Sequence, residues 1–239
     1  MLITGSTALV TGANRGIGAA FTRALLDRGA VKVYAGVRDP GAINDPRLTA
    51  IGLDLTDRDS IAEAARIAGD VDLVINNAGV DTGTPTLGDE AGLREELEIN
   101  YLGPVAVSRA FAPVLAANGG GAIVNMLSAL AWVTLPTTGG YASAKAAMLQ
   151  ATNSLRLNLH EQGTLVTAVH VGYVDTDMTT RVDAPKLAPD AVAAAALDGV
   201  EAGAHEVLVD DFARSVRAAL SRPLSGLYPL LATPVAGAS

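Results

Sequence analysis

The sequence predicts a Rossmann-type α/β fold, a doubly wound parallel sheet of about seven strands with helices on both faces. Short apolar runs alternate with longer helical patterns over the 239 residues, as they do where parallel strands are joined by helical crossovers. A glycine-rich turn, TGANRGIG at 11–18, joins the first strand to the first helix. The other motifs also fall just after a strand or in the helix that follows it, at the edge where such sheets bind ligands.

The boundaries of the elements follow from apolar runs and turn residues. The predicted strands are 6–10, 31–37, 49–53, 71–75, 122–127, 165–171 and 206–209. Helices are expected from the glycine-rich turn to Gly29, from an N-cap at Thr56 to Ala68, and over 90–117, 141–162, 188–202 and 211–220. Pro104 and Pro113 are expected to bend or subdivide the region 90–117. Residues 1–221 are expected to form a single domain, and 222–239 a surface extension or a partly disordered tail.

Composition limits the partners of this chain. Half of it is hydrophobic (49%) but only 4% is aromatic, which predicts an aliphatic core. A net charge of −8 without a basic cluster argues against nucleic acid and anionic membranes as partners. The absence of cysteine excludes disulfides, and His160, His170 and His205 lack ligand spacing, so no metal is expected. Neither a signal-peptide pattern nor an apolar run of spanning length is found, so we expect a soluble cytoplasmic protein.

The glycine-rich turn predicts a phosphate-binding site. Gly12, Gly16 and Gly18 lie between a strand and a helix, where backbone N–H groups and the helix N-terminus can face a pyrophosphate. The spacing G-x-x-x-G-x-G differs from G-x-G-x-x-G, so the interpretation depends on this context. Asn14, Arg15 and Ile17 of the same turn are further candidates for binding a dinucleotide.

The end of the second strand indicates which dinucleotide binds. An acidic residue there would hold a ribose 2′-hydroxyl, but the strand ends in Val37, and the next residue, Arg38, can bond a 2′-phosphate. Arg15 is a second cation for that phosphate, and the alternative is that both arginines are ordinary surface charges. NADPH is therefore favoured, and NADH stays possible if the strand extends by one residue to Asp39.

Two short motifs at other strand ends could contact the adenosine. Asp54-Leu55 could bond the adenine edge, and Asn77-Ala78-Gly79 could line the ribose. On chemistry alone, both motifs serve equally well as turn residues.

Three polar residues could act together on one reacting oxygen. Tyr141 and Lys145 are one helical turn apart and share a face, and Ser128 ends the apolar run AIVNMLS. A nearby ammonium and a nicotinamide cation would lower the pKa of the phenol, while the serine would hold the substrate oxygen as hydride arrives. By itself Y-x-x-x-K is a weak pattern. The chain has no G-x-S-x-G elbow and no Lys-Ser/Thr ending to its glycine-rich turn.

As a set, these motifs resemble those of the short-chain dehydrogenases/reductases, in their shorter single-domain branch. Over about residues 4–210 they are Thr11-Gly12-x-x-x-Gly16-x-Gly18, Asp54, Asn76-Asn77-Ala78-Gly79, Asn100, Ser128 and Tyr141-x-x-x-Lys145. The resemblance implies that Tyr141 moves the proton, that Lys145 binds the nicotinamide ribose and tunes Tyr141, and that Ser128 positions the carbonyl oxygen. Asn100 would shape a helix kink and hold a water that links Lys145 to solvent. The type implied is an NADPH-preferring carbonyl reductase with a small-molecule substrate, assembled as a homodimer or homotetramer.

One motif departs from the family pattern. After the sixth strand the family usually has Pro-Gly, whereas this chain has Val171-Gly172, followed by Tyr173, Val174 and Thr176. Backbone groups of Val174 and the hydroxyl of Thr176 could contact the nicotinamide carboxamide. Without the proline we expect a more mobile loop but no loss of activity.

Apolar residues near the catalytic positions predict the substrate pocket. They are Leu130, Trp132, Leu135, Tyr173 and Met178, and Trp132 could equally pack beneath the loop. The short stretch between Thr176 and the next helix predicts an open cleft for ketones or aldehydes of varied shape. The alternatives are an NAD-dependent alcohol dehydrogenase, a dinucleotide sensor without turnover, and an isomerase or epimerase of the same broad fold.

Overall fold

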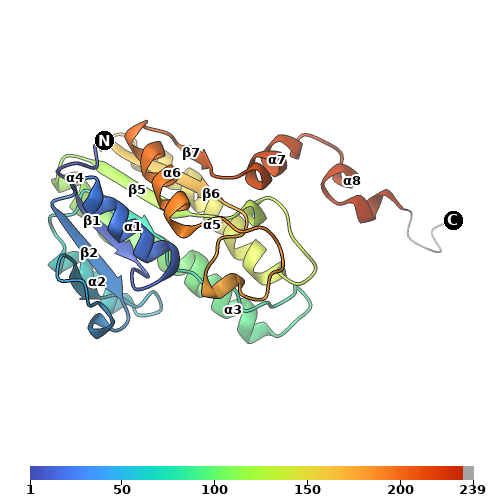
Figure 1. Ribbon diagram of the computed structural model, residues 1–239, viewed down its shortest axis with the longest axis horizontal. Helices are drawn as coiled ribbons and strands as arrows, with labels where there is room; N and C mark the ends of the chain where they lie inside the picture. Colours follow the sequence, from blue (N-terminus) through green and yellow to red (C-terminus); the bar gives the residue numbers. More distant parts are fainter. Residues whose placement is uncertain (234–239) are drawn as a thin grey trace.

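All the strands of the sheet run parallel, in the order β3-β2-β1-β4-β5-β6-β7 (Figure 1). This computed structural model describes residues 1–233. The strand order reverses between β1 and β4, which creates the crevice where doubly wound sheets bind ligands. The predicted fold class is confirmed. The strands are β1 (Thr7–Thr11), β2 (Lys32–Val37), β3 (Thr49–Gly52), β4 (Leu73–Asn76), β5 (Gly121–Met126), β6 (Thr164–His170) and β7 (Glu206–Leu208).

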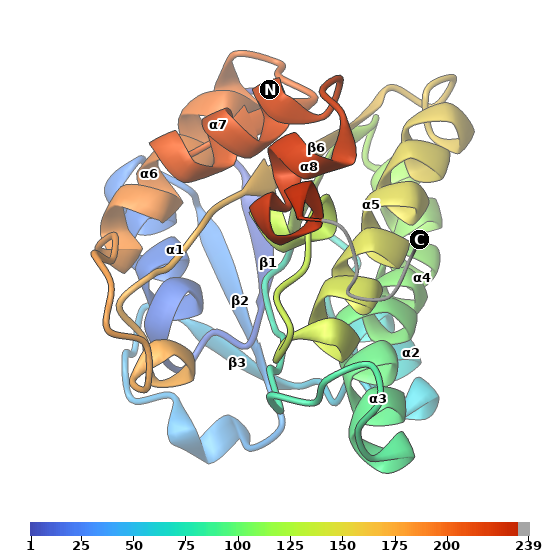
Figure 2. The same ribbon diagram turned by 90° about the vertical axis from the view of Figure 1, so that its right-hand side faces the viewer.

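Helices cover both faces of the sheet. Figure 2 shows α1 and α6 on one side and α2, α4 and α5 on the other. The α-helices are α1 (Gly16–Asp27), α2 (Arg58–Ile67), α3 (Glu90–Leu97), α4 (Gly103–Ala117), α5 (Gly139–Asn158), α6 (Pro189–Glu201), α7 (Asp211–Ala219) and α8 (Leu224–Leu227). A π-helical turn, η2 (Glu98–Leu102), joins α3 to α4, and the 3₁₀ turns are η1 (Pro40–Ala42), η3 (Ala129–Ala131), η4 (Asp177–Thr179) and η5 (Pro229–Ala232).

The core forms two layers, one on each face of the sheet. Phe21 and Leu197 are fully buried between α1, α6 and the sheet, and Phe111 and Leu115 of α4 are fully buried on the opposite face. The rest of both layers is almost entirely aliphatic, as the composition predicts. Burying each such side chain contributes roughly 1.5–3 kcal/mol.

Several helix boundaries differ from those predicted. The N-cap of α2 is Asp57 instead of Thr56, because the Asp57 carboxylate accepts hydrogen bonds from the N–H groups of Asp59 and Ser60. The chain turns after α5 at residues 159–163, so this helix ends earlier than predicted. The region 90–117 is divided at η2, whereas α4 continues through Pro113.

The C-terminal segment contains further helical turns. In Figure 1, α7 and α8 extend from one side of the sheet. The Tyr228 hydroxyl accepts a hydrogen bond from the Thr134 N–H (3.2 Å), which ties this segment to the body. The predicted tail therefore includes α8 and η5, and its last residues, 234–239, lie outside the described part. No helix within residues 1–233 is long and apolar enough to cross a membrane.

Candidate functional site

The glycine-rich turn follows β1 and is held by the segment that follows β4. The Thr11 hydroxyl oxygen accepts from the N–H groups of Asn77 (3.0 Å) and Ala78 (3.1 Å), and the Asn77 amide donates to the Thr11 carbonyl (2.9 Å). A Cβ on Gly18 would lie 2.0 Å from the Gly12 carbonyl oxygen, so only glycine allows this approach. The two segments form one closely packed unit.

This turn fits the pyrophosphate of a dinucleotide. Gly12 and Gly16 have φ values of 65° and 52°, a region that favours glycine. No side chain caps the N-terminus of α1, so the N–H groups of its first turn remain available to an anion. Asn14, Arg15 and Ile17 lie in or beside the turn as predicted, and Ile17 also lines the adjoining cavity.

The end of β2 carries one exposed cation and one carboxylate that is engaged by the backbone. The strand ends at Val37 and Arg38 is exposed. The Asp39 carboxylate accepts from the Gly41 N–H (2.9 Å) and caps η1, so it is turned to the local backbone. The second cation, Arg15, forms an exposed ion pair with Asp177 (2.6 Å).

Asp54 and Leu55 have structural partners of their own. The Asp54 carboxylate accepts from the N–H (2.9 Å) and hydroxyl (2.8 Å) of Thr56. These bonds, helped by the charge of Arg38, hold the pKa of Asp54 below its usual value. The Leu55 side chain is buried and packs so closely that a Cβ on Gly103 would lie 2.7 Å from it. Contact of either residue with an adenine stays a prediction.

The predicted tetrad lines one cavity of about 540 Å³ at the carboxyl edge of the sheet. Asn100 comes from η2, Ser128 follows β5, and Tyr141 and Lys145 lie on α5. Among the other residues that line this cavity are Asn77, Gly79, Val174 and Thr176. The structure thus brings together in one cavity the predicted residues that follow β4, β5 and β6 along the chain.

Lys145 is buried in the wall of this cavity. Its ammonium donates to the Met126 carbonyl (2.9 Å) and lies 5.5 Å from the centre of the Tyr141 ring. A Cβ on Gly79 would be 2.7 Å from the Asn100 Oδ1 atom and 3.7 Å from the Lys145 Nζ atom. Gly79 therefore gives the two side chains room to approach each other.

Burial changes the proton affinity of both α5 residues. It lowers the pKa of Lys145 to about 8. It also raises the pKa of Tyr141, with a further increase from the charges of Asp81 and Glu96 and an opposing effect of the Ser128 hydroxyl. In this environment burial outweighs the expected lowering by Lys145. Burial thus favours the protonated form of this tyrosine.

Asn100 lies in a helix distortion, as the resemblance of the sequence motifs to the family implies. Its amide donates to the Val80 (2.8 Å) and Glu96 (3.0 Å) carbonyls, and its oxygen accepts from the Val80 N–H (3.2 Å). The π-helical turn places this amide toward the segment that follows β4. Its role in holding a water stays a prediction.

The segment after β6 crosses back toward the glycine-rich turn. A Cβ on Gly16 would lie 3.2 Å from the Thr176 methyl group. At the position of the missing proline, the Val171 carbonyl accepts from the Ser128 hydroxyl (3.3 Å), and the next N–H, of Gly172, donates to Asp210 (2.7 Å). Asp210 was not identified in the sequence, although it also caps α7. This anchor compensates for part of the restraint that proline would supply.

Most of the predicted substrate-binding residues face the cavity. Those that line it are Ser128, Leu130, Leu135, Tyr141, Tyr173 and Met178. Trp132 is absent from the described lining residues: its ring stacks on His170, with centroids 3.8 Å apart and planes 13° apart. The structure thus favours the alternative in which Trp132 packs beneath the loop.

His170 supports the backbone of Ser128, a role that no sequence pattern indicates. Its Nδ1 atom lies 3.3 Å from the Ser128 carbonyl oxygen, and burial lowers its pKa to about 4. The ring is therefore neutral at neutral pH, and its Nδ1–H donates to that carbonyl. On the other side of the stack, the Arg217 guanidinium lies 5.8 Å from the centre of the Trp132 ring.

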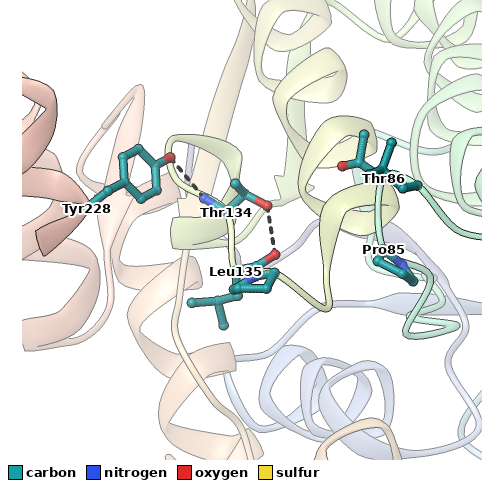
Figure 3. A pocket seen from close by; sticks show the side chains of 7 residues that line it. Pro85, Thr86, Thr134, Leu135 and Tyr228 are labelled. Carbon is teal, nitrogen blue, oxygen red and sulfur yellow. Dashed lines mark hydrogen bonds between the residues drawn. The ribbon is translucent and has the colours of Figure 1, made fainter. Parts of the chain in front are cut away.

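A smaller hollow of about 390 Å³ adjoins the substrate side (Figure 3). Pro85 and Thr86 face Thr134 and Leu135 across it, and Tyr228 reaches over from the C-terminal segment. No group of three or more acidic or histidine residues within 1–233 is placed to hold a metal ion.

Comparisons with known proteins agree with this geometry. A family model described as short chain dehydrogenase matches residues 6–187. The chain is 37% identical over 199 residues to the 1-deoxy-11-beta-hydroxypentalenate dehydrogenase of Streptomyces avermitilis, covering 76% of this chain and 73% of that protein. It is 35% identical over 195 residues to the sorbitol dehydrogenase of Cereibacter sphaeroides, covering 77% of this chain and 76% of that protein.

Solved structures extend the likeness over nearly the whole chain. A short chain dehydrogenase from Burkholderia cenocepacia J2315, crystallised in complex with NADP, has a TM-score of 0.93 at 41% identity. The match covers 98% of this chain and 100% of that one.

Proposed function

The chain belongs to the short-chain dehydrogenase/reductase family, and we propose that it is an NADPH-dependent carbonyl reductase, which converts a ketone or aldehyde to an alcohol. As a family member it is an NAD(P)-dependent oxidoreductase of CH–OH and C=O groups. The observation that carries the finer proposal is the meeting of Ser128, Tyr141 and Lys145 in one cavity beside the glycine-rich turn.

In the proposed reaction, the cofactor supplies the hydride for the carbonyl carbon, and the chain supplies the proton for the oxygen. The Ser128 hydroxyl donates a hydrogen bond to the carbonyl oxygen and polarises it. Tyr141 then gives its phenolic proton to that oxygen, and Lys145 stabilises the phenolate that remains. Because burial raises the pKa of Tyr141, it disfavours the phenolate that proton donation leaves, so the proposed step depends on the positive charge of Lys145.

A panel of ketones and aldehydes mixed with NADPH tests this proposal, with absorbance of the reduced nicotinamide as the measurement. We expect turnover by the wild type and a loss of about 10²–10⁴-fold in kcat for Tyr141→Phe. Tyr101→Phe, on η2 and partly buried, is the matched control that keeps activity. Binding of NADPH without oxidation, unchanged in Tyr141→Phe, would show a cofactor sensor instead of an enzyme.

The preference for NADPH is supported by the groups at the end of β2. Arg38 is exposed there, the strand carries no acid at its end, and the Asp39 carboxylate is occupied by Gly41. We expect Arg38→Asp to reverse the ratio of kcat/KM for NADPH and NADH, because a carboxylate repels the phosphate and accepts from a 2′-hydroxyl. Arg47→Asp is the control, since that arginine is paired with Asp45. An unchanged ratio in Arg38→Asp would remove this arginine from the phosphate site.

The residues on the substrate side support the prediction of a cleft that accepts ketones or aldehydes of varied shape. Leu135 and Met178 are 38% and 44% exposed at the cavity, so apolar side chains are accessible to a substrate there. We expect comparable turnover of small and bulky ketones, and activity on a single polar metabolite would contradict this.

The assembly is proposed to be a homodimer or homotetramer. Leu157 on α5 is 80% exposed and Leu102, the last residue of η2, is 42% exposed. Light scattering of the purified protein tests this, and a monomer at micromolar concentration would refute it.

A further inference from the structure

Glu96 is a fully buried acid next to the catalytic cavity that none of the proposed steps uses. It lies near the end of α3, one helical turn before Asn100. A buried carboxyl group is costly unless its oxygens are paired, so its partners indicate what it is for.

One oxygen of Glu96 holds the loop that follows β4. Its Oε1 atom accepts from both the N–H and the hydroxyl of Thr82, each at 2.8 Å. Because the Thr82 proton is used there, the Thr84 hydroxyl donates to the Thr82 oxygen (2.6 Å). The same loop is fastened at Val80 by Asn100, so two side chains of one helical region clamp it. Asp81, Thr82 and Gly83 of this loop line the catalytic cavity.

The other oxygen faces the start of the catalytic helix. A Cβ on Gly140 would lie 1.9 Å from the Oε2 atom, so the carboxylate touches the backbone immediately before Tyr141. Oε2 is buried and has no hydrogen-bond partner within the described residues. The first turn of α5 contains no acidic side chain, and Thr138 makes no side-chain cap. The positive end of this helix is therefore met by an acid from α3.

A hydrogen bond joins the loop and the helix at the same place. The Gly140 N–H donates to the Thr84 carbonyl (3.0 Å), and a Cβ on Gly139 would lie 2.1 Å from the Thr86 hydroxyl oxygen. Glu96, the loop and the Gly139-Gly140 pair thus form one contact ahead of Tyr141. The pair of glycines is explained by this contact, because any side chain there would displace the loop or the carboxylate.

We propose that Glu96 is a positioning residue for the reaction: its carboxylate fixes the 81–84 loop against the N-terminal turn of α5 and so holds Tyr141 in place. The inference rests on the proposed function of Tyr141.

The carboxylate of Glu96 also acts on Tyr141 through its charge. The groups that face this tyrosine are Ser128 after β5, Lys145 on α5, Asp81 in the loop and Glu96 on α3. Both acids raise the pKa of the phenol.

The test compares Glu96→Gln with Glu95→Gln, an exposed neighbour on the same helix. Glutamine keeps an acceptor for Thr82 but removes the charge and turns an amide N–H₂ toward the helix N-terminus. We expect kcat to fall between about 10- and 100-fold with little change in the KM for NADPH, as for a small displacement of a catalytic group. We also expect the alkaline limb of the kcat profile to move to lower pH, because one charge that raises the pKa of Tyr141 is gone. Glu95→Gln should match the wild type in both.

Thr82→Val provides an intermediate case. It removes the hydroxyl bond and keeps the N–H bond to Glu96, so kcat should fall less than in Glu96→Gln, and the pH profile of kcat should stay in place.

A Glu96→Gln enzyme that only melts at a lower temperature, with kcat and its pH profile unchanged, would overturn the proposal. The Tyr141→Phe result separates the two hypotheses. An active Tyr141→Phe contradicts the proposed function, whereas an inactive one beside a wild-type-like Glu96→Gln contradicts the inference alone.

Discussion

The two sides of the cavity are held in different ways. On the cofactor side, the glycine-rich turn and the 77–79 segment meet through backbone contacts and the hydroxyl of Thr11, all buried or partly buried. On the substrate side, the walls are side chains of short loop segments, and several of them, such as Leu135 and Met178, are exposed.

This difference determines which features of the site tolerate substitution. Backbone that approaches other backbone leaves no room for a Cβ, so glycines are required on the cofactor side. A wall of exposed side chains can be altered one residue at a time with little effect on the fold. We therefore expect substitutions on the cofactor side to lower stability and cofactor binding most. Substitutions of residues that support Ser128 should have an intermediate effect on stability. Substitutions in the exposed wall of the substrate side should change only the selectivity among substrates.

Gly18→Ala should have the largest effect. Its Cβ would lie 2.0 Å from the Gly12 carbonyl oxygen and 2.7 Å from the Asn77 amide nitrogen, so the turn must move. We expect a loss of about 1–3 kcal/mol in the free energy of unfolding and NADPH binding too weak to detect by titration calorimetry. Gly69→Ala is the matched control, since its nearest neighbour would be 3.9 Å away. Wild-type affinity in Gly18→Ala would show that the two segments are not one rigid unit.

His170→Asn should have an intermediate, pH-dependent effect. The pKa of His170 is about 4 in the folded chain against an ordinary 6.5, so the unfolded chain binds the proton first as the pH falls. The contribution of the neutral His170 ring to the free energy of unfolding is complete above about pH 6.5. It is lost progressively toward pH 4, by about 3 kcal/mol in all. Asparagine keeps a donor for the Ser128 carbonyl but does not titrate.

Urea unfolding between pH 4.5 and 7 measures this effect. Stability of the wild type should fall more steeply with acid than that of His170→Asn. The exposed His160→Asn should follow the wild type. Parallel curves for wild type and His170→Asn would mean that the buried imidazole is not held neutral.

The sequence was sufficient for the sheet, the glycine-rich turn and the meeting of Ser128, Tyr141 and Lys145. These follow from local patterns, since apolar runs define strands and the fold brings their carboxyl ends to one edge. It was insufficient for Asp210, His170 and Glu96. Each of these acts on a segment distant in the chain, and each resembles an ordinary cap, strand or helix residue until its partner is known.

The direction of the Trp132 ring could not be predicted from the sequence either, although the residues involved are close in the chain. Trp132 lies four residues after Ser128, but the short turn η3 directs its ring to His170 instead of the cavity. An aromatic residue near a catalytic one does not reveal which way a 3₁₀ turn will direct it. The Gly139-Gly140 pair was the one local sign of a close contact before Tyr141, because adjacent glycines at a helix start indicate backbone approached by another group.

The smallest effects should distinguish the two aromatic residues of the substrate side. Tyr173 lines the cavity, so Tyr173→Ala should change the ratio of kcat/KM for bulky and small ketones by roughly 10-fold. Trp132→Phe should change it by less than about 3-fold, because a phenyl ring still stacks on His170 behind the wall. Competition between two ketones in one reaction, resolved by chromatography of the alcohols, measures the ratio directly. A shift in Trp132→Phe as large as that in Tyr173→Ala would place Trp132 in the substrate wall, and the division between wall and support would then have to be redrawn.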